Sequence, residues 1–207
     1  NNTGKILLPL RYILETTYRC NLNCQFCYLG HEKQLKKNEL TTQEWFNIID
    51  QIPRYAFISF LGGEVFLRKD MMELFKYCSK RVFGKVNIFT NGTLVTDNDI
   101  DELMKYKSLL FSVSLDSIGS KHDEIRQLKG AYDRTLSTLL KIKSKKSKKK
   151  FPLLEVKTVV LKDNLDDLPK LYKICLENDF DFISFSFERT THFRQNPVLK
   201  DNIDDIF

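Results

Sequence analysis

RYILETTYRCNLNCQFC, residues 11–27, is the stretch that decides the fold of this chain. Its first part is a strand-like run of β-branched and aromatic residues, and its end carries three cysteines, Cys20, Cys24 and Cys27. Thiolates spaced in this way can hold three irons of a cubic iron–sulfur cluster, which leaves the fourth iron an open position for a small molecule. Because open metal positions are typical of catalytic sites, the stretch predicts chemistry at the end of a strand.

The composition indicates one soluble domain. The 207 residues are 42% hydrophobic and 29% charged, which suits a single domain over residues 1–207 with a real core. No apolar run is long enough to span a membrane, and residues 1–5 lack the layout of a secretory signal. The other cysteines, Cys78 and Cys175, lie far apart rather than in a disulfide framework, so we expect a cytoplasmic protein.

The net charge of +6 is concentrated in residues 141–150, which contain seven lysines. This run follows a helix-like segment with Tyr132, Leu136, Leu139 and Leu140, and no aromatic residue is interleaved to stack on bases. Nucleic acid binding is therefore not expected, and we interpret the run as a solvated helix end and loop. The alternative is long-range attraction of an acidic electron donor.

Strand-like and helix-like segments alternate along the chain, which requires a parallel sheet with right-handed crossovers. The predicted strands are residues 11–17, 56–61, 86–90, 109–115, 154–161 and 182–187. Polar, glycine-rich or cysteine-rich groups follow the first four of them. Ligands of parallel α/β proteins bind at that edge, either on an open doubly wound sheet or on a barrel whose strand ends converge.

Helices are predicted where apolar residues recur with helical spacing, so that each set forms one buried stripe. The sets are Trp45, Ile48, Ile49 and Ile52; Met71, Leu74, Phe75 and Cys78; Ile100, Leu103 and Met104; Leu168, Leu171, Tyr172 and Cys175. Cys78 and Cys175 are thus expected to be buried small hydrophobes. Side-chain oxygens mark two helix starts, at Thr41 or Thr42 and at Thr96 or Asp97.

The strand ends resemble those of the radical S-adenosylmethionine (radical SAM) enzymes. The resemblance rests on the spacing of Cys20, Cys24 and Cys27, on Gly-Gly-Glu at 62–64 and on Thr-Asn-Gly at 90–92. It spans essentially the whole chain. It implies an α/β fold, a partial (β/α)6 TIM-like barrel with parallel strands.

Residues 112–116, 122–126 and 130–133 are similar to the branch that contains anaerobic sulfatase-maturating and peptide-modifying enzymes. Members of that branch often carry a cysteine-rich carboxyl-terminal extension with auxiliary clusters. Because the sequence begins with Asn and stops at Phe207 without a capping signal, we expect a chain that is cut short.

The resemblance implies two cofactors. Cys20, Cys24 and Cys27 match the cysteines that bind a [4Fe-4S] cluster, whose unique iron is chelated by the amino and carboxylate groups of S-adenosylmethionine. A zinc site completed by His31 or another residue is the alternative interpretation of the thiols, but it leaves the glycine-rich strand ends unexplained.

The resemblance also implies contacts to S-adenosylmethionine near its adenine and its amino group. Phe26 matches an aromatic residue whose backbone lies against the adenine. Gly62 and Gly63 would let the backbone approach the amino group, because a Cβ would obstruct it, and Glu64 would accept a hydrogen bond from the ammonium. On its own, a Gly-Gly-Glu group is usually a turn that ends a strand.

Ser114 and Arg126 match positions that contact the methionine carboxylate in the resembling branch. A guanidinium offers paired donors for this purpose, although Arg126 could instead form a surface ion pair with Asp123 or Glu124. Asn91 is a further cofactor-binding candidate, but Asn-Gly is a favoured turn pair in any protein.

Histidine is the usual general base near neutral pH. None of His31, His122 and His192 is assigned a catalytic role. The sequence does not identify a residue that contacts substrate.

The function that the resemblance implies is reductive cleavage of S-adenosylmethionine to methionine and a 5'-deoxyadenosyl radical, which abstracts a hydrogen atom from a substrate. A peptide or protein substrate is expected, with a reducing partner such as flavodoxin or ferredoxin. Two alternatives stay open: an electron-transfer module without radical chemistry, and a cofactor-biosynthesis enzyme that acts on a small molecule. Glu64, Ser114 and Arg126 favour an enzyme, because a module that only stores electrons does not need to bind methionine.

Overall fold

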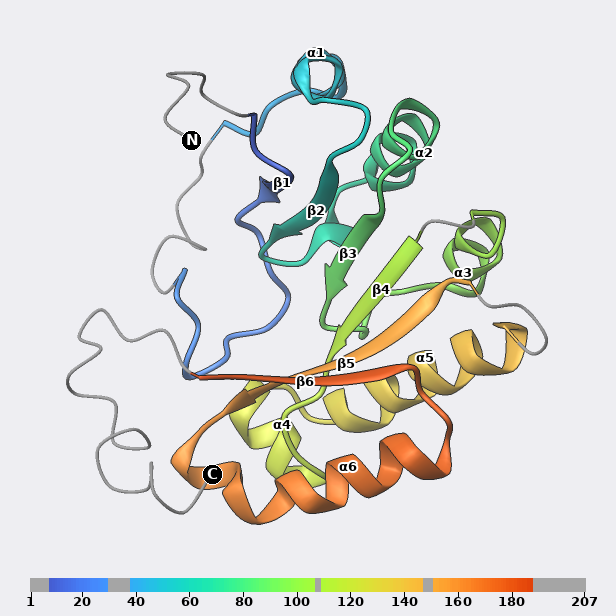
Figure 1. The fold of residues 1–207 in the computed structure, drawn as a ribbon. Coiled ribbons are helices and arrows are strands. Elements are labelled where there is room, and N and C mark those ends of the chain that lie inside the picture. The colour runs from blue at the N-terminus through green and yellow to red at the C-terminus, as the bar shows by residue number, and fades with distance from the viewer. Residues whose placement is uncertain (1–7, 30–37, 107–108, 147–150, 188–207) are drawn as a thin grey trace, which may run out of the picture.

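The structure is a computed structural model, and it describes residues 8–29, 38–106, 109–146 and 151–187. Six parallel strands form one sheet in chain order (Figure 1). They are β1 (Arg11–Thr17), β2 (Phe57–Gly62), β3 (Val86–Thr90), β4 (Leu109–Ser114), β5 (Leu153–Val160) and β6 (Phe182–Phe187). All six predicted strands are confirmed, and their ends differ from the prediction by one residue at most.

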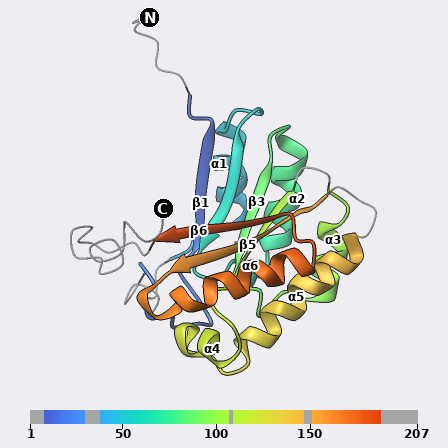
Figure 2. The ribbon, with the colours of Figure 1, turned by 60° about the horizontal axis from the view of Figure 1, so that its bottom comes forward.

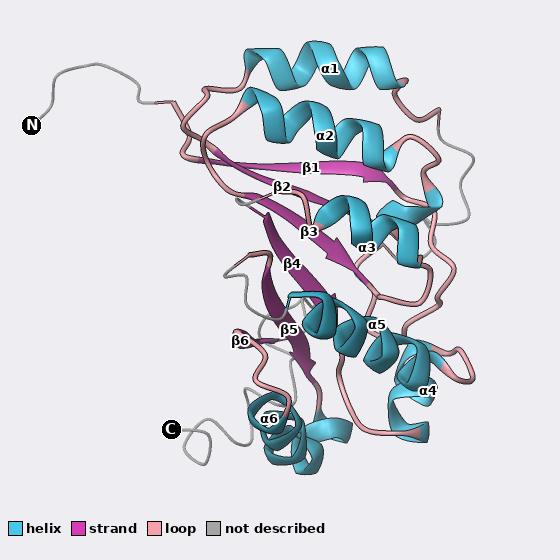
Figure 3. Ribbon diagram, turned by 90° about the vertical axis from the view of Figure 1, so that its right-hand side faces the viewer, coloured by secondary structure: helices cyan, strands magenta, loops and turns pink. Residues whose placement is uncertain are grey.

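The sheet is a partial barrel. It twists so strongly that β6 runs across the direction of β1 and β3 (Figure 2). Within the described residues β1 and β6 are not paired with each other, so the barrel stays open between them. A doubly wound sheet reverses its strand order and is covered on both faces, whereas this sheet keeps one order and its helices lie along one face (Figure 3). The expected partial (β/α)6 barrel is therefore confirmed.

Helices connect the strands. They are α1 (Thr42–Gln51), α2 (Met71–Arg81), α3 (Asp97–Leu103), α4 (Ser120–Arg126), α5 (Ala131–Lys146) and α6 (Leu168–Glu177), with short 3-10 segments η2 (Val65–Leu67) and η3 (Lys162–Asp167). Thr41 caps α1 and Thr96 caps α3. In each cap the threonine side chain accepts from the backbone amide three residues further on, and the side chain of that residue accepts from the threonine amide. No helix in the described part has the length and apolar content of a membrane-spanning segment.

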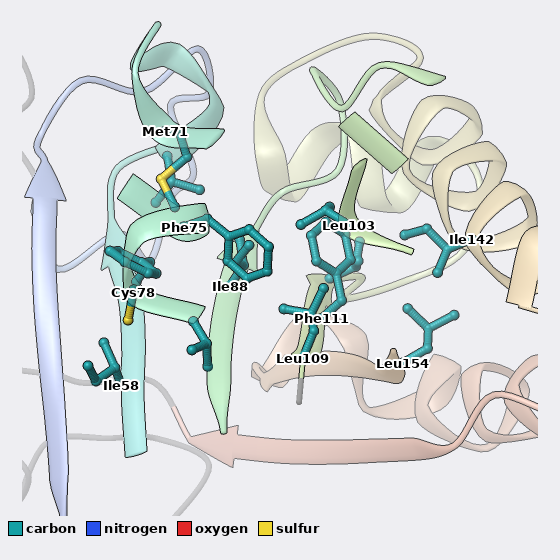
Figure 4. Close-up of a cluster of buried hydrophobic side chains, with 14 of the residues drawn as sticks. Ile58, Met71, Phe75, Cys78, Ile88, Leu103, Leu109, Phe111, Ile142 and Leu154 are labelled. Atoms are coloured by element: carbon teal, nitrogen blue, oxygen red, sulfur yellow. The ribbon is translucent and has the colours of Figure 1, made fainter. Parts of the chain in front are cut away.

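The hydrophobic core fills the space between the sheet and its helices (Figure 4). Alternate strand residues such as Ile58, Ile88 and Phe111 point into it, because side chains of a strand alternate between its two faces. Cys78 and Cys175 lie in this core as predicted, and burial raises the pKa of their thiols to about 12 and about 11. They are therefore inert apolar side chains rather than nucleophiles.

Helix α5 buries a different stripe from the one that the sequence indicates. Leu139 is buried but Leu140 is exposed, and the inward face carries Thr135 and Thr138. The Thr135 hydroxyl donates to the carbonyl of Asn91, and the Thr138 hydroxyl to that of the next residue, both at 2.8 Å. A count of apolar residues misses this stripe because a threonine can be buried once its hydroxyl is bonded.

The lysine run forms the last turns of α5. Each of its four described lysines pairs with an aspartate: Lys141 with Asp97, Lys143 with Asp179, Lys145 with Asp101 and Lys146 with Asp181. Lys146 is buried. The predicted helix end is therefore correct but it is not simply solvated, because its lysines tie α5 to α3 and to the segment that enters β6.

Candidate functional site

The carboxyl ends of the first four strands bring the predicted site residues to one edge of the sheet. The cysteine loop, residues 18–29, follows β1, and Glu64 follows β2. Asn91 follows β3, while Ser114 ends β4 and Arg126 ends the helix after it. Because all strands are parallel, these ends share one edge, as the sequence predicts.

The three cysteines of the loop are half-buried and form no disulfide. The amide of Cys27 donates to the carbonyl of Cys24 at 3.2 Å, and the amide of Leu22 donates to Sγ of Cys20 at 3.4 Å. Among the described residues no three Cys, His, Asp or Glu side chains gather as ligands of one metal ion. His31, which the zinc alternative invokes, lies outside those residues, so the group that the thiols bind stays a prediction.

The cysteine loop is anchored on both sides. On one side the side-chain amide of Asn21 donates to Thr93 at 2.8 Å, and that of Asn91 donates to Asn21 at 2.9 Å. On the other side the amide of Gln25 donates to the carbonyl of Ile125 at 3.2 Å. The Asn91 side chain is thus occupied in positioning the loop, and its predicted contact to S-adenosylmethionine stays a prediction.

Gly62 and Gly63 lie where the chain after β2 passes closely under the end of β1. A Cβ on Gly62 would meet the carbonyl oxygen of Thr17 at 2.1 Å, and one on Gly63 would meet that of Arg19 at the same distance. Gly62 also has φ of +141°, which side chains rarely adopt. Backbone packing therefore requires both glycines here, whereas their predicted approach to the amino group of S-adenosylmethionine stays a prediction.

Glu64 is fully buried and connects the ends of β2 and β3. Its Oε1 accepts from the Thr90 hydroxyl at 2.7 Å and from the Phe66 amide at 3.1 Å, and its Oε2 accepts from the Asn91 amide at 2.7 Å. Burial raises the pKa of this carboxyl against the opposing effect of these donors. A carboxylate oxygen can accept two bonds, so Oε2 retains capacity for the predicted ammonium donor.

Arg126 is buried, and its ion-pair partner differs from both candidates that the sequence offers. Its Nε lies 2.6 Å from Oδ2 of Asp116, an ion pair whose atoms are not aligned as a hydrogen bond. Asp123 instead accepts from the amides of Gly130 and Tyr132 at the start of α5. A surface ion pair with Asp123 or Glu124 is therefore wrong, because the side chain turns inward from α4.

The guanidinium of Arg126 also reaches the cysteine loop. Its Nη1 donates to Sγ of Cys24 at 3.7 Å, and its carbon lies 5.2 Å from the centre of the Phe26 ring. Burial disfavours the charged guanidinium, but Asp116 and Cys24 outweigh this, so the pKa of Arg126 is raised. A permanent positive charge thus lies beside one of the three thiols.

The roles predicted for Phe26 and Ser114 stay predictions. Phe26 faces Arg126 through its ring, as described above. Ser114 is half-buried, and its hydroxyl makes no hydrogen bond within the part of the chain that the structure describes. Its register neighbour on β5 is Lys157.

His122 is a structural residue. It is buried, and its Nδ1 accepts from the backbone amide of Asp116 at 3.1 Å. Burial and the positive charge of Arg126 lower its pKa to about 4, so the ring is neutral at pH 7. Its assignment as non-catalytic agrees with this geometry, whereas His31 and His192 lie outside the described residues.

Sequence reasoning missed two residues that organise this site. Asp116 enters only as part of the motif at 112–116, although it holds Arg126 in place. Asn21 lies unremarked between two cysteines, although it links the loop to Asn91. Both residues contact segments that lie far away along the chain, so local patterns do not reveal them. Only the position of Asn21 between two of the clustered cysteines could have indicated its role.

The comparisons with known proteins identify the family. The Radical SAM superfamily matches residues 14–175. This chain belongs to that superfamily. S-adenosylmethionine and a [4Fe-4S] cluster are the cofactors of the superfamily and its members are enzymes, so the predicted recognition, cofactors and enzyme class are confirmed at the level of the family.

Several curated relatives are similar to this chain over part of their length. Fe-coproporphyrin III synthase of Methanosarcina barkeri is 33% identical, with 82% of this chain and 41% of the relative covered. The sporulation killing factor maturation protein SkfB of Bacillus subtilis is 28% identical over 81% of this chain and 40% of the relative. The antilisterial bacteriocin subtilosin biosynthesis protein AlbA of the same organism is 32% identical over 67% of this chain and 32% of the relative. The chain thus spans about two-fifths of the length of its first relatives.

Solved structures confirm the fold. SuiB of Streptococcus suis bound to S-adenosylmethionine gives a TM-score of 0.77 at 22% identity, with 91% of this chain and 43% of that chain covered. anSMEcpe with bound AdoMet gives a TM-score of 0.67 at 22% identity, with 86% and 51% covered. At these identities the likeness concerns the partial barrel and not the reaction.

Proposed function

We propose that this chain is the catalytic core of a radical SAM enzyme in which Cys20, Cys24 and Cys27 hold a [4Fe-4S] cluster. The observation that carries the proposal is the position of Arg126, whose buried guanidinium lies 3.7 Å from Sγ of Cys24. Thiolate-bound clusters are anionic, and a cation and N–H donors beside their sulfurs favour them. The donor set therefore fits the cluster: three thiols that form no disulfide lie on one anchored loop, with a fixed positive charge beside them.

The residues at the ends of β2 and β4 are proposed to hold S-adenosylmethionine. Glu64 would bind its ammonium with the remaining capacity of Oε2, and Ser114 offers a hydroxyl at the end of β4. When bound, the two cofactors supply one-electron chemistry that generates a 5'-deoxyadenosyl radical for hydrogen abstraction. The chain itself positions these groups: Asp116 fixes Arg126, and Asn91 fixes the cysteine loop.

The substrate that we propose is a peptide or protein side chain. The support is that SkfB is a maturation protein and that AlbA belongs to the biosynthesis of a bacteriocin, subtilosin. A second candidate is a small tetrapyrrole, because Fe-coproporphyrin III synthase is 33% identical to this chain. An external reductant such as flavodoxin or ferredoxin would supply the electron.

We further propose that residues 1–207 contain one domain and that the protein works in the cytoplasm. One continuous sheet and one core cluster support the single domain. None of the five cysteines forms a disulfide, as suits a reducing compartment in which cluster thiols are maintained.

The test is anaerobic reconstitution with iron and sulfide, followed by dithionite and S-adenosylmethionine. We expect the native chain to form 5'-deoxyadenosine and Cys24→Ala to lose both cluster absorbance and product, because one iron loses its thiolate. Cys175→Ala is the matched control, since that thiol is buried in the core and should not affect the cluster. A full cluster in Cys24→Ala would contradict the ligand assignment, and a full cluster without product in the native chain would favour the electron-transfer module.

A further inference from the structure

The face of the sheet opposite the helices carries polar side chains among apolar ones. The helices cover the other face, so the residues that alternate with the core positions of β3 to β6 point to the inner, concave side (Figure 3). Four of them form what we call the polar strip: Asn87, Ser112, Glu155 and Ser184. Each comes from a different strand, so the strip crosses the sheet.

Hydrogen bonds join the members of the polar strip, and the acidic residue Glu155 is the main acceptor. The Ser112 hydroxyl donates to the carboxylate of Glu155, and it also lies 3.0 Å from the side-chain oxygen of Asn87. The Ser184 hydroxyl donates to Oε1 of Glu155 at 2.6 Å. The carboxylate is therefore held in one orientation by groups from both neighbouring strands.

Glu155 makes no direct ion pair in the described part of the chain, and Lys157 is bonded to the same Ser184 hydroxyl that donates to this carboxylate. Acids on the outer face of the molecule are, by contrast, widely paired directly with lysines. Two hydroxyl donors leave about half of the acceptor capacity of a carboxylate unused. The unused acceptor capacity of this half-buried carboxylate can therefore take a donor that comes from outside the chain.

Lys157 lies two residues further along the same face of β5. Its Nζ donates to the Ser184 hydroxyl at 3.3 Å and lies 5.9 Å from the centre of the Phe89 ring. It stands level with Ser114 on β4, at the end of the sheet that carries the proposed cofactor site. An acceptor and a donor are thus displayed side by side, directly below that site.

We propose that Glu155 is a substrate-recognition residue, which accepts hydrogen bonds from the N–H groups of a peptide lying on the concave face while Lys157 donates to its carbonyl groups. This inference rests on the proposed function and deepens it by choosing between its two substrate classes. A peptide offers both donors and acceptors, and a lysine or arginine side chain would also supply a cation for direct contact with Glu155. The carboxylate groups of a coproporphyrin could pair with Lys157, but an iron coproporphyrin has no N–H donor for Glu155 because its pyrrole nitrogens bind the metal.

The experiment measures peptide binding to the full chain without cofactors. The probes are a short blocked alanine peptide with a central lysine, the same peptide with a central glutamate, and Fe-coproporphyrin III. We expect the native chain to bind the lysine peptide about tenfold more tightly than the glutamate peptide. Glu155→Gln, which keeps the shape and one acceptor oxygen but removes the charge, should abolish this preference, whereas Glu73→Gln on the exposed side of α2 should preserve it.

A preference that survives in Glu155→Gln would overturn the proposal, and so would tight binding of the porphyrin together with no binding of either peptide. If Glu155→Gln fails to fold, Lys157→Gln is tested instead. Removal of the Lys157 cation should increase the ratio by which the chain binds the lysine peptide more tightly than the glutamate peptide. An unchanged or narrower preference in that variant would overturn the proposal. Since no cofactor is present, failure of S-adenosylmethionine cleavage by the native chain would count against the proposed function alone.

Discussion

At the scale of the residue, Glu64 combines a structural position with a proposed binding role. Its three protein donors come from Thr90, Phe66 and Asn91, so the carboxylate stabilises the junction of β2 and β3. A ligand ammonium would use only the capacity that these donors leave. Substitution at Glu64 therefore has two separable effects.

We expect Glu64→Gln to fold and to bind S-adenosylmethionine about tenfold more weakly, because the amide keeps the shape but loses the charge that attracts an ammonium. Glu64→Ala should in addition lose about 1–3 kcal/mol of folding free energy, since buried donors are left unpaired. Calorimetry measures the affinity and denaturant unfolding the stability. Unchanged affinity in Glu64→Gln would mean that the carboxylate is only structural.

The lowered pKa of the buried His122 side chain predicts that the stability of the fold depends on pH. Its pKa of about 4 lies below the ordinary value of 6.5, so between these values the unfolded chain takes up a proton that the folded chain does not. This contribution to stability is therefore fully present above pH 6.5 and is lost as the pH falls towards 4, by up to about 3 kcal/mol.

His122→Gln retains an acceptor for the Asp116 amide but does not titrate. We expect the unfolding free energy of this variant to fall less between pH 7 and pH 4.5 than that of the native chain, because other groups titrate equally in both. Denaturant melts at several pH values provide the measurement. Parallel curves for the two proteins would show that the ring is not buried as a neutral base.

At the scale of the element, the two capping boxes show how a short stretch of sequence specifies the residue at which a helix begins. Thr96 accepts from the amide of Asp99 at 3.2 Å, and the Asp99 side chain accepts in return from the Thr96 amide at 2.9 Å. The same arrangement begins α1 at Thr41. These bonds span three residues, so no tertiary contact is needed to form them.

Thr96→Ala should lower the folding free energy by about 1 kcal/mol, because it leaves an amide of the first turn of α3 without its acceptor. The thermal melt measures this loss. Asn98→Ala is the control on the same helix, since Asn98 is exposed and caps nothing. Equal stability of both variants would contradict the capping role.

At the scale of the whole molecule, the single sheet and core predict one cooperative unit. We expect thermal or denaturant unfolding of residues 1–207 to give one transition by fluorescence of Trp45 in α1 and by far-ultraviolet circular dichroism. Trp45 packs at the β1 side of the core, while most helical signal comes from the rest of the chain. Two separated transitions would mean that the two halves of the partial barrel unfold independently.

The sequence alone determined the order of the strands and helices and both helix caps. It also determined that Cys78 and Cys175 lie in the core, and it identified the superfamily. Strand and helix periodicities and caps act over a few residues, and the cysteine spacing lies within one loop. This is why the predicted strands end within one residue of those observed.

Only the tertiary structure decided the partners of the buried polar groups. Arg126 meets Cys24 across 102 positions of the chain, Asn21 meets Asn91 across 70, and Ser112 meets Glu155 across 43. Such contacts depend on strand register and on which face of the sheet the helices cover, which no local pattern specifies. For the same reason the sequence offered no substrate-contacting residue, whereas the folded sheet places Glu155 and Lys157 side by side on its concave face.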